Sequence, residues 1–145
     1  MNKDYIIFSS IDWDVLWQLH QQLTTSLIKD NNRVLFVENT GVRNIKISDT
    51  SRLLKKIKSR LNSFAGIVEI DKKFSLLIPI IFPFPYSKLF TNLNYLLLRY
   101  KIRKWMRITN FKDPTIITFL PTPLMHKIID SFNSSLKIYY CANHM

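Results

Sequence analysis

The chain has 145 residues, which is the size of one ordinary domain, and 47% of them are hydrophobic, so the composition excludes a disordered protein. Lys and Arg number 21 against 10 Asp and Glu, and the resulting net charge of +11 predicts an anionic partner, with compositional bias as the alternative. The single cysteine, Cys141, excludes an intrachain disulfide and a CxxC metal pair, and it fits a reducing compartment.

The N-terminal quarter predicts a βαβ unit. Tyr5–Phe8 is strand-like, and leucines then recur at helical spacing from Leu16 to Leu27, with Asp12 placed to cap the helix start. Val34–Val37 is a second strand, and its continuous apolar run predicts burial on both faces. The unit therefore predicts parallel strands joined by a right-handed crossover.

Alternating elements continue through the middle of the chain. The basic segment 43–60 carries a helical stripe of Leu and Ile, and Ile67–Ile70 and Phe74–Ile80 are expected to be a pair of strands. Residues 81–85 must be extended, because proline restricts both itself and the residue before it. No apolar stretch is long enough to cross a bilayer or to act as a signal peptide. We therefore expect a cytoplasmic protein, and association with the inner face of the membrane is the alternative.

The segment Tyr86–Ile108 is helical, but its apolar side chains fall on two nearly opposite faces. This pattern predicts a kink, two shorter helices, or a helix that has contacts on both sides. Thr115–Phe119 is expected to be a core strand, and residues 121–132 a helix that opens with proline in its first turn. Leu136–Tyr140 is the last predicted strand.

These elements predict one domain, residues 1–145, with a doubly wound, mostly parallel α/β sheet. Ligands of such sheets bind at the carboxyl ends of the strands, so the residues that follow each strand are the candidate substrate contacts. Those after the first strand include two carboxylates and an indole, which suit sugar recognition. The candidates are Asp12, Trp13, Asp14, Glu38, Asn39, Arg43, Thr122 and His144.

Each candidate has a structural alternative. Asp12 can cap the first helix while Asp14 complements its dipole, and Glu38 can pair with Arg43 in a solvated turn. Of the other histidines, His20 is expected to be half-buried and hydrogen-bonded, and His126 is expected at the surface. We name no catalytic residue.

The chain contains only two glycines, Gly41 and Gly66. A dinucleotide fingerprint or a P-loop needs several glycines close together, so that the backbone can approach phosphate. We therefore expect no NAD or ATP cofactor in this chain, and no metal, since no metal-ligand spacing is present.

A basic run in the long predicted helix, with Tyr100 and Trp105 among its cations, favours an anionic membrane surface. Nucleic acid is a less favoured partner, and an ordinary solvated helix face is the remaining alternative. The residues expected to face the membrane are Arg99, Lys101, Arg103, Lys104 and Arg107.

The ordered set of motifs resembles the start of bacterial GT-B glycosyltransferases of the family 4 kind, which build cell-surface polysaccharides such as teichuronic acid. The likeness spans nearly the whole chain. It rests on Phe8–Asp14, Trp17-Gln18, His20-Gln21, Arg33–Arg43, Pro83–Ser87, Thr118–Pro123 and Tyr139–Cys141.

The resemblance implies two Rossmann-like domains that face each other across a cleft. The N-terminal domain would hold a sugar acceptor, often lipid-linked, and lean on the membrane. The donor-binding domain, for the nucleotide sugar, would lie outside this chain, in a further domain or a separate chain, and hexosyl transfer would require it. The alternative function is a non-catalytic basic Rossmann-like module that binds nucleic acid or anionic membranes.

Overall fold

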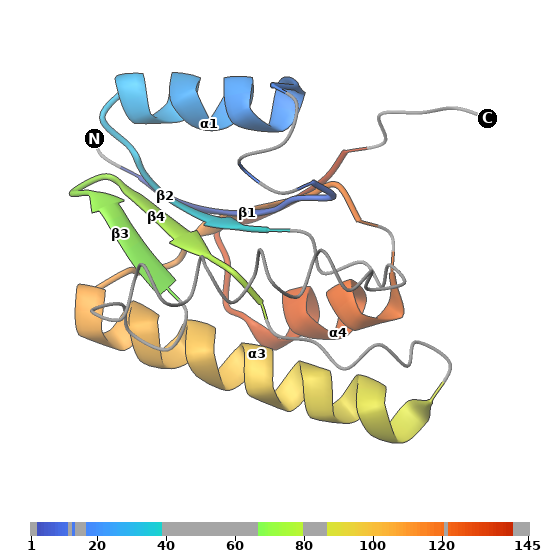
Figure 1. Cartoon of the computed structure of the whole chain (residues 1–145). Helices are drawn as coiled ribbons and strands as arrows, with labels where there is room; N and C mark the ends of the chain where they lie inside the picture. The colour runs from blue at the N-terminus through green and yellow to red at the C-terminus, as the bar shows by residue number, and fades with distance from the viewer. Residues whose placement is uncertain are drawn as a thin grey trace.

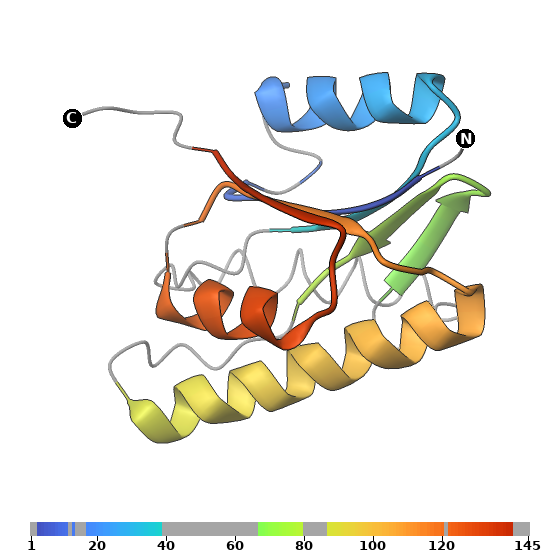
Figure 2. The same cartoon turned by 180° about the vertical axis from the view of Figure 1, so that it is seen from behind.

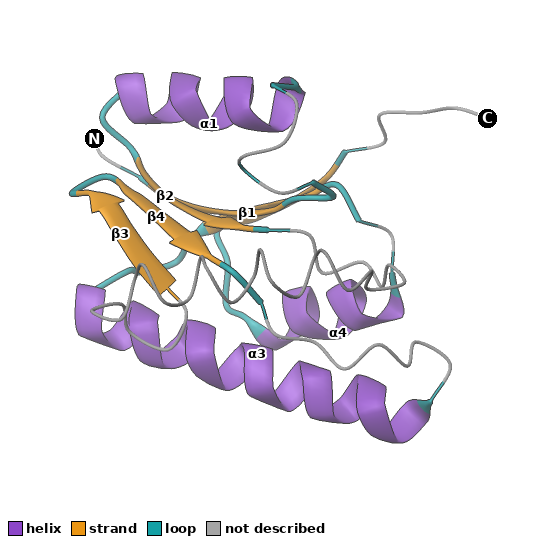
Figure 3. Cartoon of the chain, viewed as in Figure 1, coloured by secondary structure: helices purple, strands orange, loops and turns teal. Residues whose placement is uncertain are grey.

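The computed structural model describes residues 3–11, 13, 17–38, 67–79, 87–120 and 122–140. Within these residues strands and helices follow one another as the sequence predicts (Figure 3). Their bounds are β1 Asp4–Phe8, α1 Leu19–Lys29, β2 Arg33–Val37, β3 Ile67–Asp71, β4 Phe74–Leu77, α3 Lys88–Thr109, β5 Thr115–Thr118, α4 Pro123–Ser131 and β6 Leu136–Tyr139.

One six-stranded sheet organises the described residues, in the order β3-β4-β2-β1-β5-β6. All neighbours run parallel except β3, which pairs antiparallel with β4. Helix α1 covers one face of the sheet, and α3 and α4 cover the other (Figures 1 and 2). This arrangement confirms the predicted doubly wound α/β class and is Rossmann-like.

The core is divided by the alternation of side chains along the central strands. Ile6 and Phe8 of β1 belong to the cluster beneath α3 and α4, whereas Ile7 belongs to the cluster on the α1 side. All three are fully buried, as are the apolar residues of β2. The prediction that the second strand, Val34–Val37, is buried on both faces is therefore confirmed.

The start of the first helix differs from the prediction. Helix α1 begins at Leu19 with Gln18 at the cap position, where the Gln18 backbone N–H donates to Oε1 of Gln21 at 2.9 Å. The prediction that Asp12 caps this helix is therefore wrong, because the cap position lies six residues later, at Gln18. Leu19 also lies exposed, while His20, Gln21 and Thr24 are the buried residues of α1.

The segment expected to be a kinked helix, two shorter helices or a helix with contacts on both sides is one helix of 22 residues, α3. It ends at Asn110, which adopts the left-handed conformation that commonly terminates helices. The expectation of two shorter helices is therefore wrong. The predicted helix in 43–60, the extended stretch 81–85 and Cys141 lie outside the described residues.

Candidate functional site

The carboxyl ends of the parallel strands meet at one edge of the sheet. Hydrogen bonds of the sheet continue one residue past the strands, since the Ser9 N–H donates to the Val37 carbonyl at 2.9 Å and the Glu38 N–H to the Leu77 carbonyl at 3.0 Å. The Phe119 N–H likewise donates to the last carbonyl of β1 at 3.0 Å. Residues that follow three different strands, β1, β2 and β5, are thus held side by side at this edge.

Two of the predicted site residues, Glu38 and Trp13, are brought together at this edge. Glu38 is only 2% exposed, and its Oε1 accepts a hydrogen bond from the backbone N–H of Trp13 at 3.1 Å. The Trp13 ring packs on the sheet, with its centroid 5.0 Å from that of Phe36 and 4.7 Å from that of Phe74. Glu38 therefore fixes the turn after β1, which gives both residues a structural role at the site.

Replacing Glu38 with alanine is expected to lower the free energy of unfolding by about 2–3 kcal/mol, because a buried N–H loses a charged acceptor. Glu38→Gln should cost less, because its amide oxygen can still accept from Trp13. Urea denaturation followed by circular dichroism measures both losses. Equal stability of Glu38→Ala and the unmodified protein would contradict this role.

His20 reaches the same edge from the first turn of α1. Its Nε2 lies 3.0 Å from Oγ of Ser10, and its ring centroid is 3.9 Å from that of Phe119. The side chain is 5% exposed, so it is more deeply buried than predicted, and Nδ1 has no hydrogen-bond partner among the described residues. Burial disfavours the imidazolium and lowers the pKa of His20 below 6.5.

The lowered pKa of His20 predicts a loss of stability in mild acid. As the pH falls below 6.5, His20 is protonated in the unfolded chain while it stays neutral in the folded protein. The free energy of unfolding therefore falls as the pH falls. At higher pH both states are neutral and no such effect remains. Between about pH 7.5 and about pH 5, His20→Gln should lose less stability than the unmodified protein in urea denaturation. The same pH dependence in both proteins would overturn this prediction.

The other described residues of the prediction serve local structure. Thr122 follows β5 and caps α4, where its Oγ1 accepts from the Met125 N–H at 3.3 Å. His126 is exposed as predicted, and its ring stacks on Tyr139 with the centroids 5.6 Å apart. The remaining candidates, Asp12, Asp14, Asn39, Arg43 and His144, lie outside the described residues.

The basic residues of α3 are arranged around its outer face and flanks. Arg103, Lys104 and Arg107 are exposed, whereas Arg99 and Lys101 are half-buried at the sides of the helix. Arg103 donates to the Ser131 carbonyl at the end of α4 at 2.7 Å, and Lys104 lies 5.8 Å from the Tyr100 ring centroid. Three of the five predicted cations therefore lie on the exposed side.

The outer face of α3 also carries apolar side chains that the sequence prediction did not assign to any surface. Leu98, Ile102 and Trp105 pack into the core, so the second apolar stripe faces outward. That stripe lies in the first turns of the helix, and the exposed cations lie in its last turns. Its exposed members are Leu89, Leu93, Leu96, Leu97 and Tyr100.

The apolar half of α3 lies at the same end of the molecule as the carboxyl edge of the sheet. Helix α3 runs opposite to β1 and β5, so it starts near the points where these strands end (Figure 1). Leu89 and Leu93 are therefore on the side of the molecule that carries Glu38 and Ser9. A molecule held against the start of α3 would therefore be at the same end of the molecule as the predicted substrate edge.

Within the described ranges, no helix is both long enough and apolar enough to cross a membrane, and no group of three His, Cys, Asp or Glu side chains could hold a metal ion. Comparison of the chain with protein families, with curated proteins and with solved structures finds no match.

Proposed function

We propose that this chain is the acceptor-side half of a GT-B glycosyltransferase, which moves a sugar from a nucleotide sugar to a cell-surface polysaccharide precursor at an anionic membrane. The Rossmann-like sheet and the motif resemblance support the class of enzyme. The observation that carries the proposal is the outer face of α3, whose exposed leucines lie at the same end of the molecule as the carboxyl edge of the sheet. A lipid-linked acceptor needs this juxtaposition, because its sugar must reach the site while its chain stays in lipid.

The chemistry of α3 fits the surface of an anionic bilayer. Leucines and Tyr100 can enter the boundary between headgroups and acyl chains, and the later cations can meet anionic headgroups. Trp13 and Glu38 would then belong to the wall of the acceptor site, with catalysis dependent on the donor-binding half. No cofactor is proposed for this chain, and the nucleotide sugar is the donor substrate of the complete enzyme.

Vesicle flotation tests this function. We expect binding to phosphatidylcholine vesicles to rise when about 30% phosphatidylglycerol is included, because each cation near the surface contributes about 1 kcal/mol. Binding should rise again when the vesicles carry polyprenyl-diphosphate-linked N-acetylglucosamine. No added binding with the lipid-linked sugar would contradict an acceptor site. Tight, salt-sensitive binding to RNA at the same ionic strength would favour the alternative, a basic module for nucleic acid, which the net charge of +11 makes the second candidate.

A further inference from the structure

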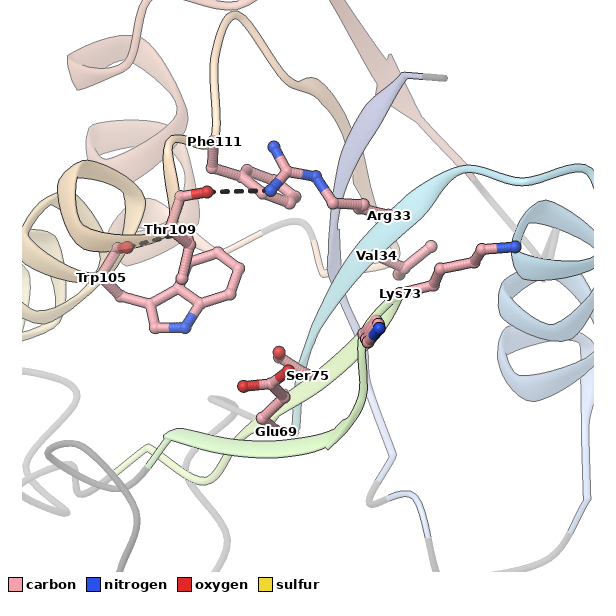
Figure 4. A pocket seen from close by; sticks show the side chains of 9 residues that line it. Arg33, Val34, Glu69, Lys73, Ser75, Trp105, Thr109 and Phe111 are labelled. Atoms are coloured by element: carbon pink, nitrogen blue, oxygen red, sulfur yellow. Dashed lines mark hydrogen bonds between the residues drawn. The ribbon is translucent and has the colours of Figure 1, made fainter. Parts of the chain in front are cut away.

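A pocket of about 220 Å³ lies at the amino-terminal edge of the sheet, opposite to the edge that holds Glu38. It is enclosed by the start of β2, the β3–β4 hairpin and the last turns of α3 (Figure 4). The volume is below the 300–1,000 Å³ or so of sites for drug-sized ligands, so it suits a molecule of about one ring. Nothing in the predicted substrate site accounts for this pocket.

Polar side chains line this pocket where apolar ones would be expected beneath a helix. Ser75 and Trp105 are each only 7% exposed, and both line the pocket. A ligand in the pocket would therefore have the Ser75 hydroxyl and the Trp105 indole N–H among its polar contacts.

Glu69 adds a carboxylate to the polar lining of the pocket. Glu69 stands directly opposite Ser75 in the antiparallel β3–β4 pair, so both side chains project from the same face of the sheet. Figure 4 shows Glu69 and Ser75 on the hairpin, facing Trp105 of α3 across the pocket. The pocket therefore presents two neutral donors and a carboxylate acceptor to the same small volume.

The cations beside the pocket are largely engaged within the protein. Arg33 makes two hydrogen bonds of 2.8 Å to the Asp4 carboxylate and a third, of 2.9 Å, to the Thr109 carbonyl. The Lys73 ammonium donates to Oδ1 of Asn31 at 2.5 Å. Lys72 also lines the pocket and is exposed to solvent. These contacts disfavour a dedicated anion site.

We infer that this pocket binds a neutral polyhydroxylated molecule of one ring, such as a monosaccharide or a cyclitol. Ligand hydroxyls would accept from the Trp105 N–H and donate to the Glu69 carboxylate, while the Ser75 hydroxyl can do either. The inference does not depend on the proposed glycosyltransferase function, because the pocket and the acceptor site lie at opposite edges of the sheet.

The three tryptophan indole N–H signals of the ¹⁵N-labelled protein test the inference. Glucose, N-acetylglucosamine and myo-inositol are titrated to about 50 mM, a range that detects millimolar binding. The Trp105 signal, identified by its loss in Trp105→Phe, should shift saturably with at least one of these probes, and the signals of Trp13 and Trp17 should not. Glu69→Gln and Ser75→Ala should weaken binding about fivefold or more, because each removes one ligand hydrogen bond.

Asp130→Asn is the matched control, since it neutralises an exposed acid on α4 and should leave the affinity unchanged. Thermal melting checks that the variants fold, and Glu69→Gln decides the outcome if Ser75→Ala does not. The inference is overturned if the Trp105 signal does not shift, if Glu69→Gln binds as tightly as the unmodified protein, or if only inorganic phosphate shifts the signal. Failure of vesicle binding would not affect it.

Discussion

Replacing Phe36 with alanine is expected to lower the free energy of unfolding by about 3–5 kcal/mol. Phe36 is fully buried in β2, between β1 and β4, and its ring meets that of Trp13 edge to face at 5.0 Å. Its loss would leave a cavity under the turn that Glu38 holds. Because small domains are stable by only about 5–15 kcal/mol, the variant should unfold at much lower urea concentration, as followed by circular dichroism.

Tyr100→Ala is the control for this prediction. It also truncates an aromatic side chain, but Tyr100 is 63% exposed on α3, so the expected change is within about 0.5 kcal/mol. A loss below about 1 kcal/mol for Phe36→Ala would mean that the core closes around the cavity, and it would contradict the packing described for β2.

The central strands could be predicted because their sequences carry the signal locally. Val34–Val37 is apolar at every position, and a run of this kind in so short a segment is typical of a strand that is buried on both faces. The neighbours of that strand then follow from the βαβ pattern. The fold class could therefore be predicted from short apolar runs and from the order of strands and helices along the chain.

Helix boundaries and faces were harder to predict because they depend on contacts between elements. The acid at Asp12 resembles a cap, yet α1 begins at Leu19 with a contact between Gln18 and Gln21. In α3 two apolar stripes are present in the sequence, and only packing against the sheet decides that Leu98 is buried and Leu96 exposed. The sequence alone does not distinguish which of the two leucines is buried.

The carboxyl edge of the sheet could be predicted from the sequence, but only some of the contacts along it could. The edge is implied by parallel strands, and both Trp13 and Glu38 reach it. Their hydrogen bond joins residues 25 positions apart, and the contact of Ser10 with His20 depends on where α1 starts. No local motif encodes either pairing. The pocket at the amino-terminal edge of the sheet was not predicted, because nothing in the sequence distinguishes Ser75 from an ordinary strand residue.

Substituting two outward leucines of α3, Leu93→Asp with Leu96→Asp, is expected to weaken binding to phosphatidylglycerol-containing vesicles by about tenfold or more. Both side chains are exposed, so the substitutions remove little from the core, and the folded protein should remain as stable as before. They place charge where apolar contact with the acyl chains is proposed. Flotation at several protein-to-lipid ratios measures the loss.

A control variant tests whether the loss of vesicle binding is specific to this face of α3. Leu136→Asp changes a leucine of similar exposure, 55% against 53% for Leu96, on the edge strand β6 at a different part of the surface, and it should leave binding unchanged. Equal losses in the control and in the α3 variant would contradict a specific membrane face.

The cations of α3 should act differently from its leucines. Lys104→Gln with Arg107→Gln should reduce binding mainly at low salt, because the attraction between exposed charges and anionic lipid is screened within about 8–10 Å at physiological ionic strength. The leucine variant should lose binding at both low and high salt, since burial of apolar surface is little affected by screening. A salt-independent loss in the cation variant, or a loss confined to low salt in the leucine variant, would reverse the assigned roles. In the proposed geometry, the start of α3 enters the lipid and its cationic end lies among the headgroups, so the carboxyl edge of the sheet is nearer to the membrane than the amino edge.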